Sequence, residues 1–526
     1  MISKAILIKA QLDLRKYRRK LDDPMDHQKK LLFYILKQNK DTTFGLDHNF
    51  ANIRTIKDYQ EQVPLGDFSQ KYPYFKQAYE QEGILTKDPV VHWIQTTGTL
   101  GTPKYLPITQ EGVKRFSEGT SRQLFSYLLD KPGNEEILKG KVFGYIGQSR
   151  IGELNGLPIG YASGVAVERL TNPIVTKRVV PGLEITNIAD WKERLWQTML
   201  TVAAEDVRFV SGIAPVLLGF LDIMRTTIPM RLNEIKDPKL RVKVQNAIFG
   251  DVIDFEMLWP NMQLLASTGV AVESYKPLIR ELLGANISIT EWYSASEGYF
   301  AFQMHEDDSD LYLNFDNYFF EFLDLDDPSK VFLLDEVEED VPYEVIITNT
   351  HGLYRYNMHD VVKFSSVDPP KILVQGRTSS ILNLGGEKVS EDQLALVISQ
   401  AMKTLDKTSI DYILSGAVAL PLRHKIYIEL AKQTKNATKD ASQISDIYDE
   451  LMKQVNSTYD LARGQSLIQP EIHFLKEGAF QAISERKAEK SGQLAHSKVL
   501  HIVQPKDLEK YIEEDMIEYS HVPEEE

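Results

Sequence analysis

The sequence predicts a mixed α/β (α+β) fold with a large N-terminal domain, in which helices flank β-sheets, and a small α+β C-terminal domain. Three observations support this. Helical periods alternate with short β-rich runs up to about residue 370. The composition shifts after Gly376. The length of 526 residues suits two to four domains. We expect a large domain over 1–375 and a small, mobile one over 376–526.

The large domain begins with a stretch over residues 1–40 that reads as helical. An apolar run, Val90–Gln95, predicts a strand that leads directly into a glycine-rich loop. Further β-rich runs stand near 141–147, 207–213 and 343–349, with helical periods between them. Such alternation is typical of a sheet whose strands are joined by crossover helices.

The small domain begins with a helix whose start is marked by Ser390 and, three residues later, Gln393. This spacing is that of a capping box, in which each side chain bonds the other residue's backbone N–H. We expect strands at 411–420 and 425–430, a helix near 443–459 and a strand over Glu471–Leu475. The acidic stretch from about residue 508 is expected to fray.

Composition excludes several classes of protein. The formal net charge is −15 and the pI is about 5.4, which argues against a broad surface for nucleic acid or anionic membrane. There is no cysteine, so disulfides, thiolate zinc sites and cysteine nucleophiles are excluded. No apolar run reaches the ~18 residues of a membrane span. The basic N-terminal stretch reads as part of the fold rather than as a signal peptide, and we expect a cytoplasmic protein.

The first segment that carries chemistry follows the predicted strand at Val90–Gln95. It contains Thr96, Thr97, Gly98 and Thr99, and ends at Lys104. Hydroxyls and glycines at this density allow backbone N–H and side-chain O–H groups to surround phosphate oxygens. The alternative is an ordinary turn between two strands. The GxxxxGK[ST] spacing of a P-loop is absent.

The second segment, 291–298, follows another apolar run. The ring of Tyr293 is a candidate for stacking on a nucleobase, with Ser296 as a further nucleotide contact. Glu297 is a candidate Mg²⁺ ligand, since that cation prefers carboxylate oxygen. The alternative is a surface loop with an exposed aromatic residue and a solvated acid.

The third segment, 354–360, ends in Asp360, a candidate acceptor of ribose hydroxyl groups; the alternative is an aspartate that caps its own turn. His359 is assigned no role.

The fourth segment, near the expected domain boundary, offers Arg377 and Lys388 as nucleotide contacts. They stand among glycines and hydroxyl residues that suit a hinge. The alternative is a linker with solvated basic residues.

Each segment alone is weak, but their order resembles the adenylate-forming (ANL) superfamily of acyl-CoA ligases and peptide-synthetase adenylation domains. Within it the chain resembles the bacterial-type GH3 family of acyl acid–amido synthetases over roughly residues 30–505. The runs that carry this resemblance are Asn39-Lys40-Asp41-Thr42-Thr43-Phe44-Gly45, Trp259-Pro260-Asn261, Tyr354-Arg355-Tyr356 and Gly492-Gln493 with Lys498.

The chain departs from the family pattern in three places. Leu100 stands where the wider superfamily often has a hydroxyl residue. Asn357-Met358-His359 stands where many plant members have Arg-Val-Gly, which puts the local turn geometry in question. Two extra residues separate Lys498 from Gln493.

The resemblance implies an ATP- and Mg²⁺-dependent ligase that adenylates a carboxylic acid, releases pyrophosphate and passes the acyl group to an amine, expected to be an amino acid. It implies that Thr96, Thr97 and Thr99 hold phosphate, Glu297 holds Mg²⁺ and Tyr293 packs on adenine. It further implies that Asp360 binds ribose with the help of Arg377, and that Lys498 is the catalytic lysine that neutralises developing charge.

The acyl pocket leaves a weaker trace in the sequence. Arg122, on the helix after the phosphate loop, is a candidate partner of a substrate carboxylate, with a solvated helix charge as the alternative. Tyr161 and Leu217 are further substrate-binding candidates. Two other functions stay open: an acyl-CoA ligase of the same superfamily, and a non-catalytic nucleotide-binding relative. The expected partners are a small carboxylic acid and an amine or amino acid, without nucleic acid or membrane.

Overall fold

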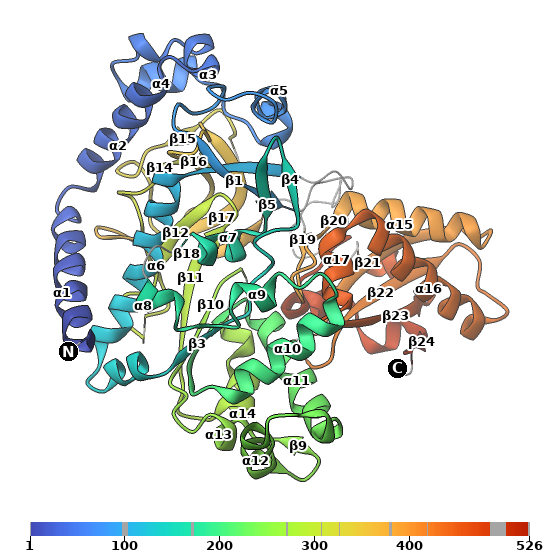
Figure 1. Ribbon diagram of the computed structural model, residues 1–526. Helices are drawn as coiled ribbons and strands as arrows, with labels where there is room; N and C mark the ends of the chain where they lie inside the picture. Colours follow the sequence, from blue (N-terminus) through green and yellow to red (C-terminus); the bar gives the residue numbers. More distant parts are fainter. Residues whose placement is uncertain are drawn as a thin grey trace.

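The computed structural model describes residues 2–96, 104–169, 173–269, 272–306, 308–325, 327–377, 381–417, 419–483 and 501–523. In Figure 1 two N-terminal helices lie along one side of the molecule, a large sheet with its helices occupies the middle, and a smaller α+β module lies on the opposite side. This mixed α/β architecture confirms the predicted fold class.

The predicted helical stretch over residues 1–40 is confirmed, with a break. Helix α1 (Ile2–Lys20) ends before α2 (Pro24–Asn39) begins. The break follows from the sequence, because the Asp23 side chain accepts from the backbone N–H of Asp26 and Pro24 occupies the first turn, where its missing N–H costs nothing.

The central sheet has twelve strands in the part of the chain that is described. From one edge to the other they are β15 (Val331–Phe332), β14 (Phe319–Asp324), β16 (Pro342–Thr348), β17 (Tyr356–Val367), β18 (Pro370–Arg377), β13 (Leu311–Leu313), β12 (Gly298–Phe302), β11 (Ser288–Ala295), β10 (Leu264–Ser267), β7 (Val207–Gly212), β3 (Lys141–Gly144) and β6 (Val179–Val180). Strand β11 pairs in parallel with β10 and antiparallel with β12. It therefore joins a parallel half to an antiparallel half.

Each half has its own core. Helices α10 (Trp191–Ala204), α11 (Ala214–Met230) and α14 (Lys276–Leu283) pack their apolar side chains with those of the parallel strands. The antiparallel half has a core rich in aromatic residues, including Phe300, Tyr318 and Phe320. Parallel strands need crossover helices, which explains the alternation seen in the sequence.

A second, four-stranded sheet lies next to the large one. Its order is β2 (Lys104–Thr109), β1 (Val90–Thr96), β5 (Leu157–Gly160) and β4 (Gly152–Leu154). The strand predicted at Val90–Gln95 is confirmed as β1. Helix α6 (Gln110–Asp130) follows β2, and α7 (Ala162–Glu168) follows β5.

Within its described residues, the C-terminal module is a four-stranded sheet of β21 (Ser409–Gly416), β22 (Leu422–Leu430), β23 (Leu467–Leu475) and β24 (Ile517–His521), packed with α15 (Glu391–Thr404), α16 (Ala437–Val455) and α17 (Ser457–Arg463). The capping box of Ser390 and Gln393 is confirmed. The expectation that the chain frays from about 508 is wrong up to residue 521, because β24 pairs with β23. Strand β18 continues two residues past the predicted boundary at 375/376, so that division stays a prediction.

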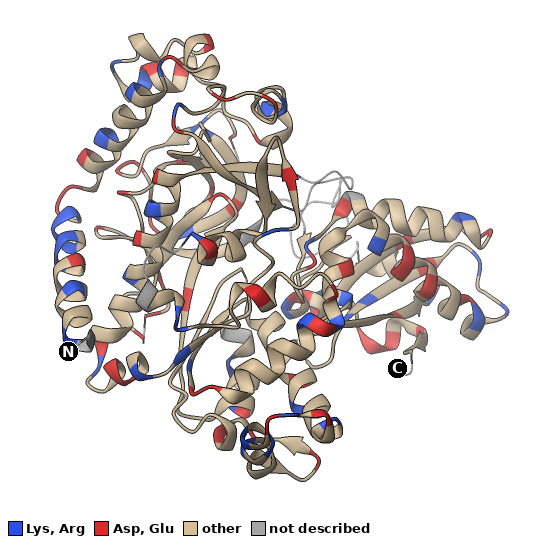
Figure 2. Cartoon of the chain, in the orientation of Figure 1, with Lys and Arg blue, Asp and Glu red and all other residues tan. Residues whose placement is uncertain are grey.

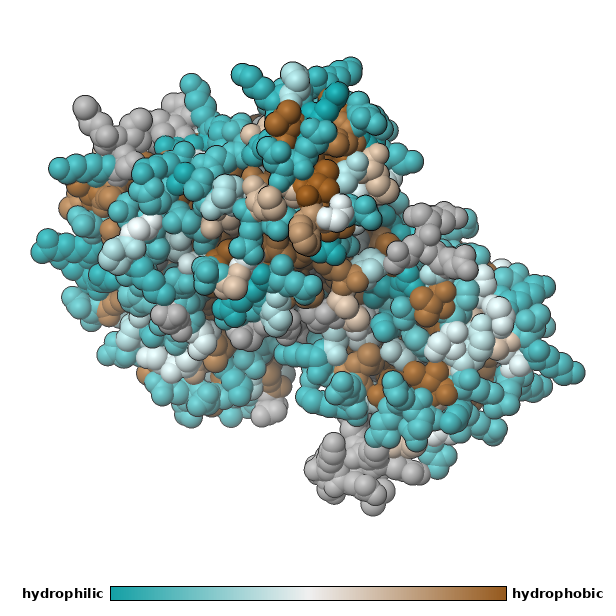
Figure 3. Space-filling model, turned by 90° about the horizontal axis from the view of Figure 1, so that it is seen from below, coloured by the Kyte–Doolittle hydropathy of each residue, from teal (hydrophilic) through white to brown (hydrophobic). Residues whose placement is uncertain are grey.

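The surface is mostly hydrophilic on the face that Figure 3 shows, with small separate hydrophobic patches. Acidic and basic residues are interspersed over most elements, while α1 carries many Lys and Arg residues (Figure 2). Among the helices described, none combines the length and apolar character that a membrane crossing requires.

Candidate functional site

The second and third sequence segments meet inside the large sheet. The Tyr293 hydroxyl on β11 donates a hydrogen bond of 2.6 Å to the Asp360 carboxylate on β17, although 67 residues separate them. Both residues are only 6% exposed. The Tyr293 ring packs against Phe300, with 5.1 Å between the ring centroids. Its hydroxyl therefore fixes the direction of the Asp360 carboxylate.

The fourth segment lies beside Asp360 through the backbone. Arg377, the last residue of β18, is the direct cross-strand partner of Asp360. Residues 378–380 lie outside the described chain. Lys388 precedes the short strand β20 (Val389–Ser390) and has a left-handed backbone, with φ of 45°. Its backbone carbonyl accepts from the Asn456 side chain at 3.5 Å.

The first segment is described only at its two ends. Thr96 is the last residue of β1 and pairs with Lys104, the first residue of β2. The Lys104 ammonium lies 5.3 Å from the centroid of the Phe68 ring. The predicted phosphate-binding residues Thr97, Gly98 and Thr99 lie outside the described residues, as does the predicted catalytic Lys498.

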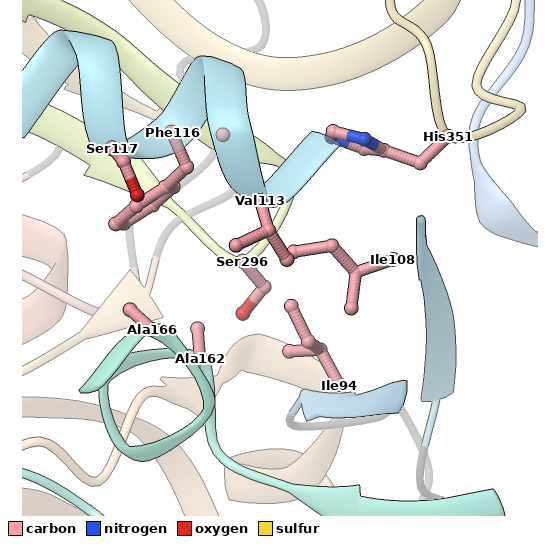
Figure 4. Close-up of a pocket in the computed structure, with 10 residues that line it drawn as sticks. Ile94, Ile108, Val113, Phe116, Ser117, Ala162, Ala166, Ser296 and His351 are labelled. Carbon is pink, nitrogen blue, oxygen red and sulfur yellow. The ribbon is translucent and has the colours of Figure 1, made fainter. Parts of the chain in front are cut away.

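A small pocket with a cavity volume of about 20 Å³ lies close to these segments (Figure 4). Figure 4 shows side chains of α6, α7 and the β1–β2 hairpin pointing into it. Ser296, predicted as a nucleotide contact, lines the same pocket. The other lining residues are Ile94, Ile108, Val113, Phe116, Ser117, Ala162, Ala166, Gly298 and His351. No lysine, arginine, aspartate or glutamate is among them, so the pocket suits an apolar group.

His351 is the one ionisable residue that lines this pocket, and sequence reasoning missed it. It is 4% exposed, and its Nδ1 has no hydrogen-bond partner in the described structure. Burial lowers its pKa to about 4, although a hydrogen bond with the Glu297 backbone opposes this shift. The imidazole is therefore neutral at pH 7. A single histidine in a loop gives no periodic signal, so only its neighbours reveal it.

Glu297 occupies the turn between β11 and β12 and is half-buried. Its backbone carbonyl accepts a hydrogen bond of 3.2 Å from the Asn349 side chain. No group of three or more potential metal ligands occurs in the described chain. A single carboxylate still fits Mg²⁺, because this cation usually takes one or two protein carboxylates together with substrate phosphates and water.

The third segment is held in place by a buried ion pair. Arg355, with φ of 42°, contacts both carboxylate oxygens of Glu321 at 3.0–3.1 Å. It also donates to the backbone carbonyls of Gln60 and Val63 at 2.8 and 3.0 Å. The sequence singled out Arg355 as part of a motif but gave no sign of Glu321, which lies 34 residues away.

Two of the three residues predicted to bind the acid have other roles in the structure. The Arg122 guanidinium contacts both oxygens of Asp316 at 2.6 Å and donates to Asn314 at 2.6 Å. Leu217 is 0% exposed inside the core of the parallel half. We therefore assign Arg122 to an internal ion pair and Leu217 to packing. Tyr161 stays a prediction; it directly precedes Ala162 of the pocket and is half-buried.

Comparison with known proteins identifies relatives along most of the chain. Three family models match: the GH3 family N-terminal domain at residues 13–253, the central domain at 311–377 and the C-terminal domain at 392–507. An indole-3-acetic acid-amido synthetase GH3.3 of Arabidopsis thaliana is 23% identical, with 90% of this chain and 88% of that protein covered. A jasmonoyl–L-amino acid synthetase GH3.5 of Oryza sativa subsp. japonica is 22% identical, covering 91% and 92%.

The fold resembles that of a solved relative. The AtGH3.15 acyl acid amido synthetase in complex with 2,4-DB matches with a TM-score of 0.62 and 19% identity, covering 97% of each chain. This likeness supports the fold, and the two sequence relatives each cover about nine-tenths of the chain.

Proposed function

Because this chain belongs to the GH3 family, we propose that it uses ATP to activate a carboxylic acid as an acyl-adenylate and then joins the acyl group to an amine. The proposed acceptor is an amino acid, and the product an amide. The observation that supports the proposed nucleotide site is the buried hydrogen bond between Tyr293 and Asp360. This bond orients the Asp360 carboxylate beside the end of β18 at Arg377.

Asp360 is proposed to accept hydrogen bonds from the two ribose hydroxyls. Because the Tyr293 ring is already covered by Phe300 and the surrounding core, we propose that Tyr293 orients Asp360 instead of stacking on adenine. Arg377 and Lys388 are proposed as further nucleotide contacts. The proposed phosphate contacts are Thr96, Thr97, Gly98 and Thr99, and Ser296 is a further proposed nucleotide contact.

Glu297 is the proposed Mg²⁺ ligand, and the ion would neutralise phosphate charge when it is bound. Lys498 is proposed to add a second positive charge from the C-terminal module. Loss of one such directed charge costs roughly 10²–10³-fold in rate. A Lys498→Ala variant should therefore lose that much pyrophosphate exchange while its unfolding midpoint stays unchanged. Unchanged exchange would move the role to Lys388.

The proposed reaction has two steps. A substrate carboxylate oxygen attacks the α-phosphorus of ATP, and the bond to the β-phosphate oxygen breaks to release pyrophosphate. The amine nitrogen then attacks the acyl carbon, AMP leaves with the bonding electron pair, and the amine loses a proton. The protein's contribution is to position the reactants and stabilise the developing charge.

The pocket of Figure 4 marks the proposed acyl site; because its cavity volume is only about 20 Å³, the acid must displace the pocket walls as it enters. Its walls come from Ile94, Ile108, Val113 and Phe116, while Ser296 and Gly298 join it to the nucleotide segments. Because no charged side chain lines it, we propose an acid with one carboxylate and an otherwise apolar body. A cytoplasmic location is part of the proposal; a nucleic-acid or membrane partner is not.

The test is ATP–pyrophosphate exchange with a panel of carboxylic acids, followed by product identification by mass. Purified protein with the active acid receives equimolar coenzyme A and mixed amino acids. The proposal expects an acyl-amide and AMP. Predominant acyl-CoA would show instead the acyl-CoA ligase of the same superfamily, and absence of exchange with every acid would favour a non-catalytic relative.

A further inference from the structure

Strand β17 contains an irregularity immediately before Asp360. Its register with β16 shifts, so that Glu344 pairs with Val361 while Ile346 pairs with Asn357. Three residues of β17, 358–360, therefore stand opposite one residue of β16. Bulges of this kind redirect a side chain and are common beside functional sites. Asp360 is the last residue of this bulge.

His359, inside this bulge, has φ of 58°, in the left-handed region. Only a few per cent of residues other than glycine adopt this region, because the Cβ atom crowds the backbone. The Asn357 side chain stabilises the turn by accepting from the His359 backbone N–H at 2.8 Å. Asn357 also donates to the Glu344 carboxylate at 2.7 Å. The bulge is thus a hydrogen-bonded structure that retains its histidine despite the backbone cost.

The His359 imidazole lies between two carboxylates from different elements. Its Nε2 is 3.5 Å from Asp67, which caps α5 (Phe68–Ala78), and its Nδ1 is 3.6 Å from Glu344 on β16. Hydrogen bonding to Glu344 raises the pKa of His359 against the opposing effect of burial, and Asp67 raises it further. A glycine would adopt the same backbone without strain but would lack both contacts.

The chain around Asp67 is itself joined to β17. The Gly66 carbonyl accepts from the Asn357 backbone N–H at 3.0 Å, and the Gly66 N–H donates to the Arg355 carbonyl at 3.2 Å. The segment at residues 66–67 therefore contacts β17 and the residue before it at three positions. Gly66 bonds the backbone at Arg355 and Asn357, and Asp67 contacts the side chain of His359.

We propose that His359, held between the carboxylates of Asp67 and Glu344, is a positioning residue that keeps the bulge in the conformation which presents Asp360 to the nucleotide. This inference rests on the proposed function, in which Asp360 binds ribose. It assigns His359 no contact with the nucleotide.

The experiment measures the dissociation constant for ATP with Mg²⁺ by calorimetry between pH 6 and pH 9, so that no acid substrate is needed. The proteins compared are the wild type, His359→Gly, His359→Ala and the control His305→Ala. His305 is also a histidine paired with a carboxylate, at 2.8 Å from Asp130, but it has no contact with the bulge. Thermal unfolding of each protein is recorded alongside.

We expect wild-type binding to weaken several-fold with rising pH, as the His359 imidazolium, whose pKa lies above its ordinary value, loses its proton. His359→Gly should bind ATP a few-fold more weakly than the wild type at pH 6. Its ATP affinity should also lack the part of the pH dependence that the histidine causes. His359→Ala, which lacks the contacts and strains the backbone, should bind about tenfold more weakly. The control should match the wild type.

Lys71, near Asp67, has a pKa lowered by burial to about 8. It titrates in every variant, so it does not distinguish their pH profiles.

Equal ATP affinity and equal pH profiles in the wild type, His359→Gly and His359→Ala would overturn the inference even if the variants were less stable. Binding by His359→Ala that equals that of His359→Gly would also overturn it, since the backbone argument requires glycine to restore part of the affinity. Absence of ATP binding by the wild type would overturn the proposed function and this inference with it.

Discussion

Among the described residues before 376, two buried arginine–carboxylate pairs resemble each other in chemistry and differ in what they support. Arg355 contacts Glu321, and Arg122 contacts Asp316, in both cases through both carboxylate oxygens. The side chains of both pairs are at most 10% exposed. Their burial and geometry alone would not separate a site residue from a structural one.

Their surroundings do separate them. Arg355 lies five positions before Asp360 and holds the segment at residues 60–66 against β17. Arg122 joins α6 to the loop after β13, and Lys20 of α1 adds a contact of 2.6 Å to the same Asp316. The first pair supports the proposed nucleotide site, whereas the second holds the N-terminal helix. Location in the fold, not the type of interaction, therefore decides the role.

The largest effect is expected from Arg355→Met. Removing one partner leaves the Glu321 carboxylate buried without its cation, which costs about 3–5 kcal/mol of unfolding free energy. Pyrophosphate exchange per folded molecule should also fall at least about tenfold, because Asp360 loses its support. Urea denaturation and exchange measure the two effects. Arg355→Lys, which keeps the charge but not the planar fork, should be intermediate. A stability equal to that of the wild type would contradict this account.

Arg122→Met should destabilise the protein less, by about 2–3 kcal/mol, since Lys20 still partners Asp316. Exchange per folded molecule and the KM for the acid should stay within about twofold of the wild type. Steady-state exchange at a temperature well below the unfolding transition measures this. A KM for the acid raised tenfold with little loss of stability would return Arg122 to the substrate-binding role that the sequence suggested.

The buried His351 differs from both arginine–carboxylate pairs, because no carboxylate of the described structure contacts it. Its pKa is lowered to about 4 by burial, so the unfolded chain binds a proton that the folded one excludes. Stability should therefore fall as the pH drops below about 6.5, by about 2 kcal/mol at pH 5. Urea midpoints from pH 7 to pH 5 should show this slope in the wild type but not in His351→Gln. Parallel slopes in the two proteins would disprove it.

The smallest expected effect is the loss of stability when Asp316 is protonated at acid pH. Burial would raise the pKa of its carboxyl group, but Arg122 and Lys20 outweigh burial and hold that pKa well below the usual range. The stabilisation is complete above pH ~4 and is lost as the pH falls towards the folded-state value, by about 1 kcal/mol at pH 3. The double variant Arg122→Met/Asp316→Asn should lack this loss in acid denaturation curves. An identical acid slope would assign the loss to other carboxylates.

Local features were predictable from the sequence, and long-range contacts were not. The capping box at Ser390, the strand at Val90–Gln95 and the small C-terminal α+β module follow from patterns within a few residues. Asp360 was predicted as a ribose contact from the order of motifs, which gave no sign of its bond to Tyr293, 67 residues away. The roles of Glu321 and His351 depend wholly on neighbours that folding brings to them. Arg122 gives a further example, because a charge on a helix does not reveal a buried partner 194 residues away.

The most direct test of the central claim is the identity of the nucleotide product. Purified wild-type protein and its Asp360→Ala variant are incubated with Mg-ATP, an acid active in exchange and an amino acid, and the nucleotides and acyl products are quantified together by mass. The account predicts AMP and pyrophosphate in equal amounts with an acyl-amide, and at least about a hundredfold less of each with Asp360→Ala, which loses two charged hydrogen bonds. Formation of ADP and phosphate, or equal AMP from both proteins, would contradict it.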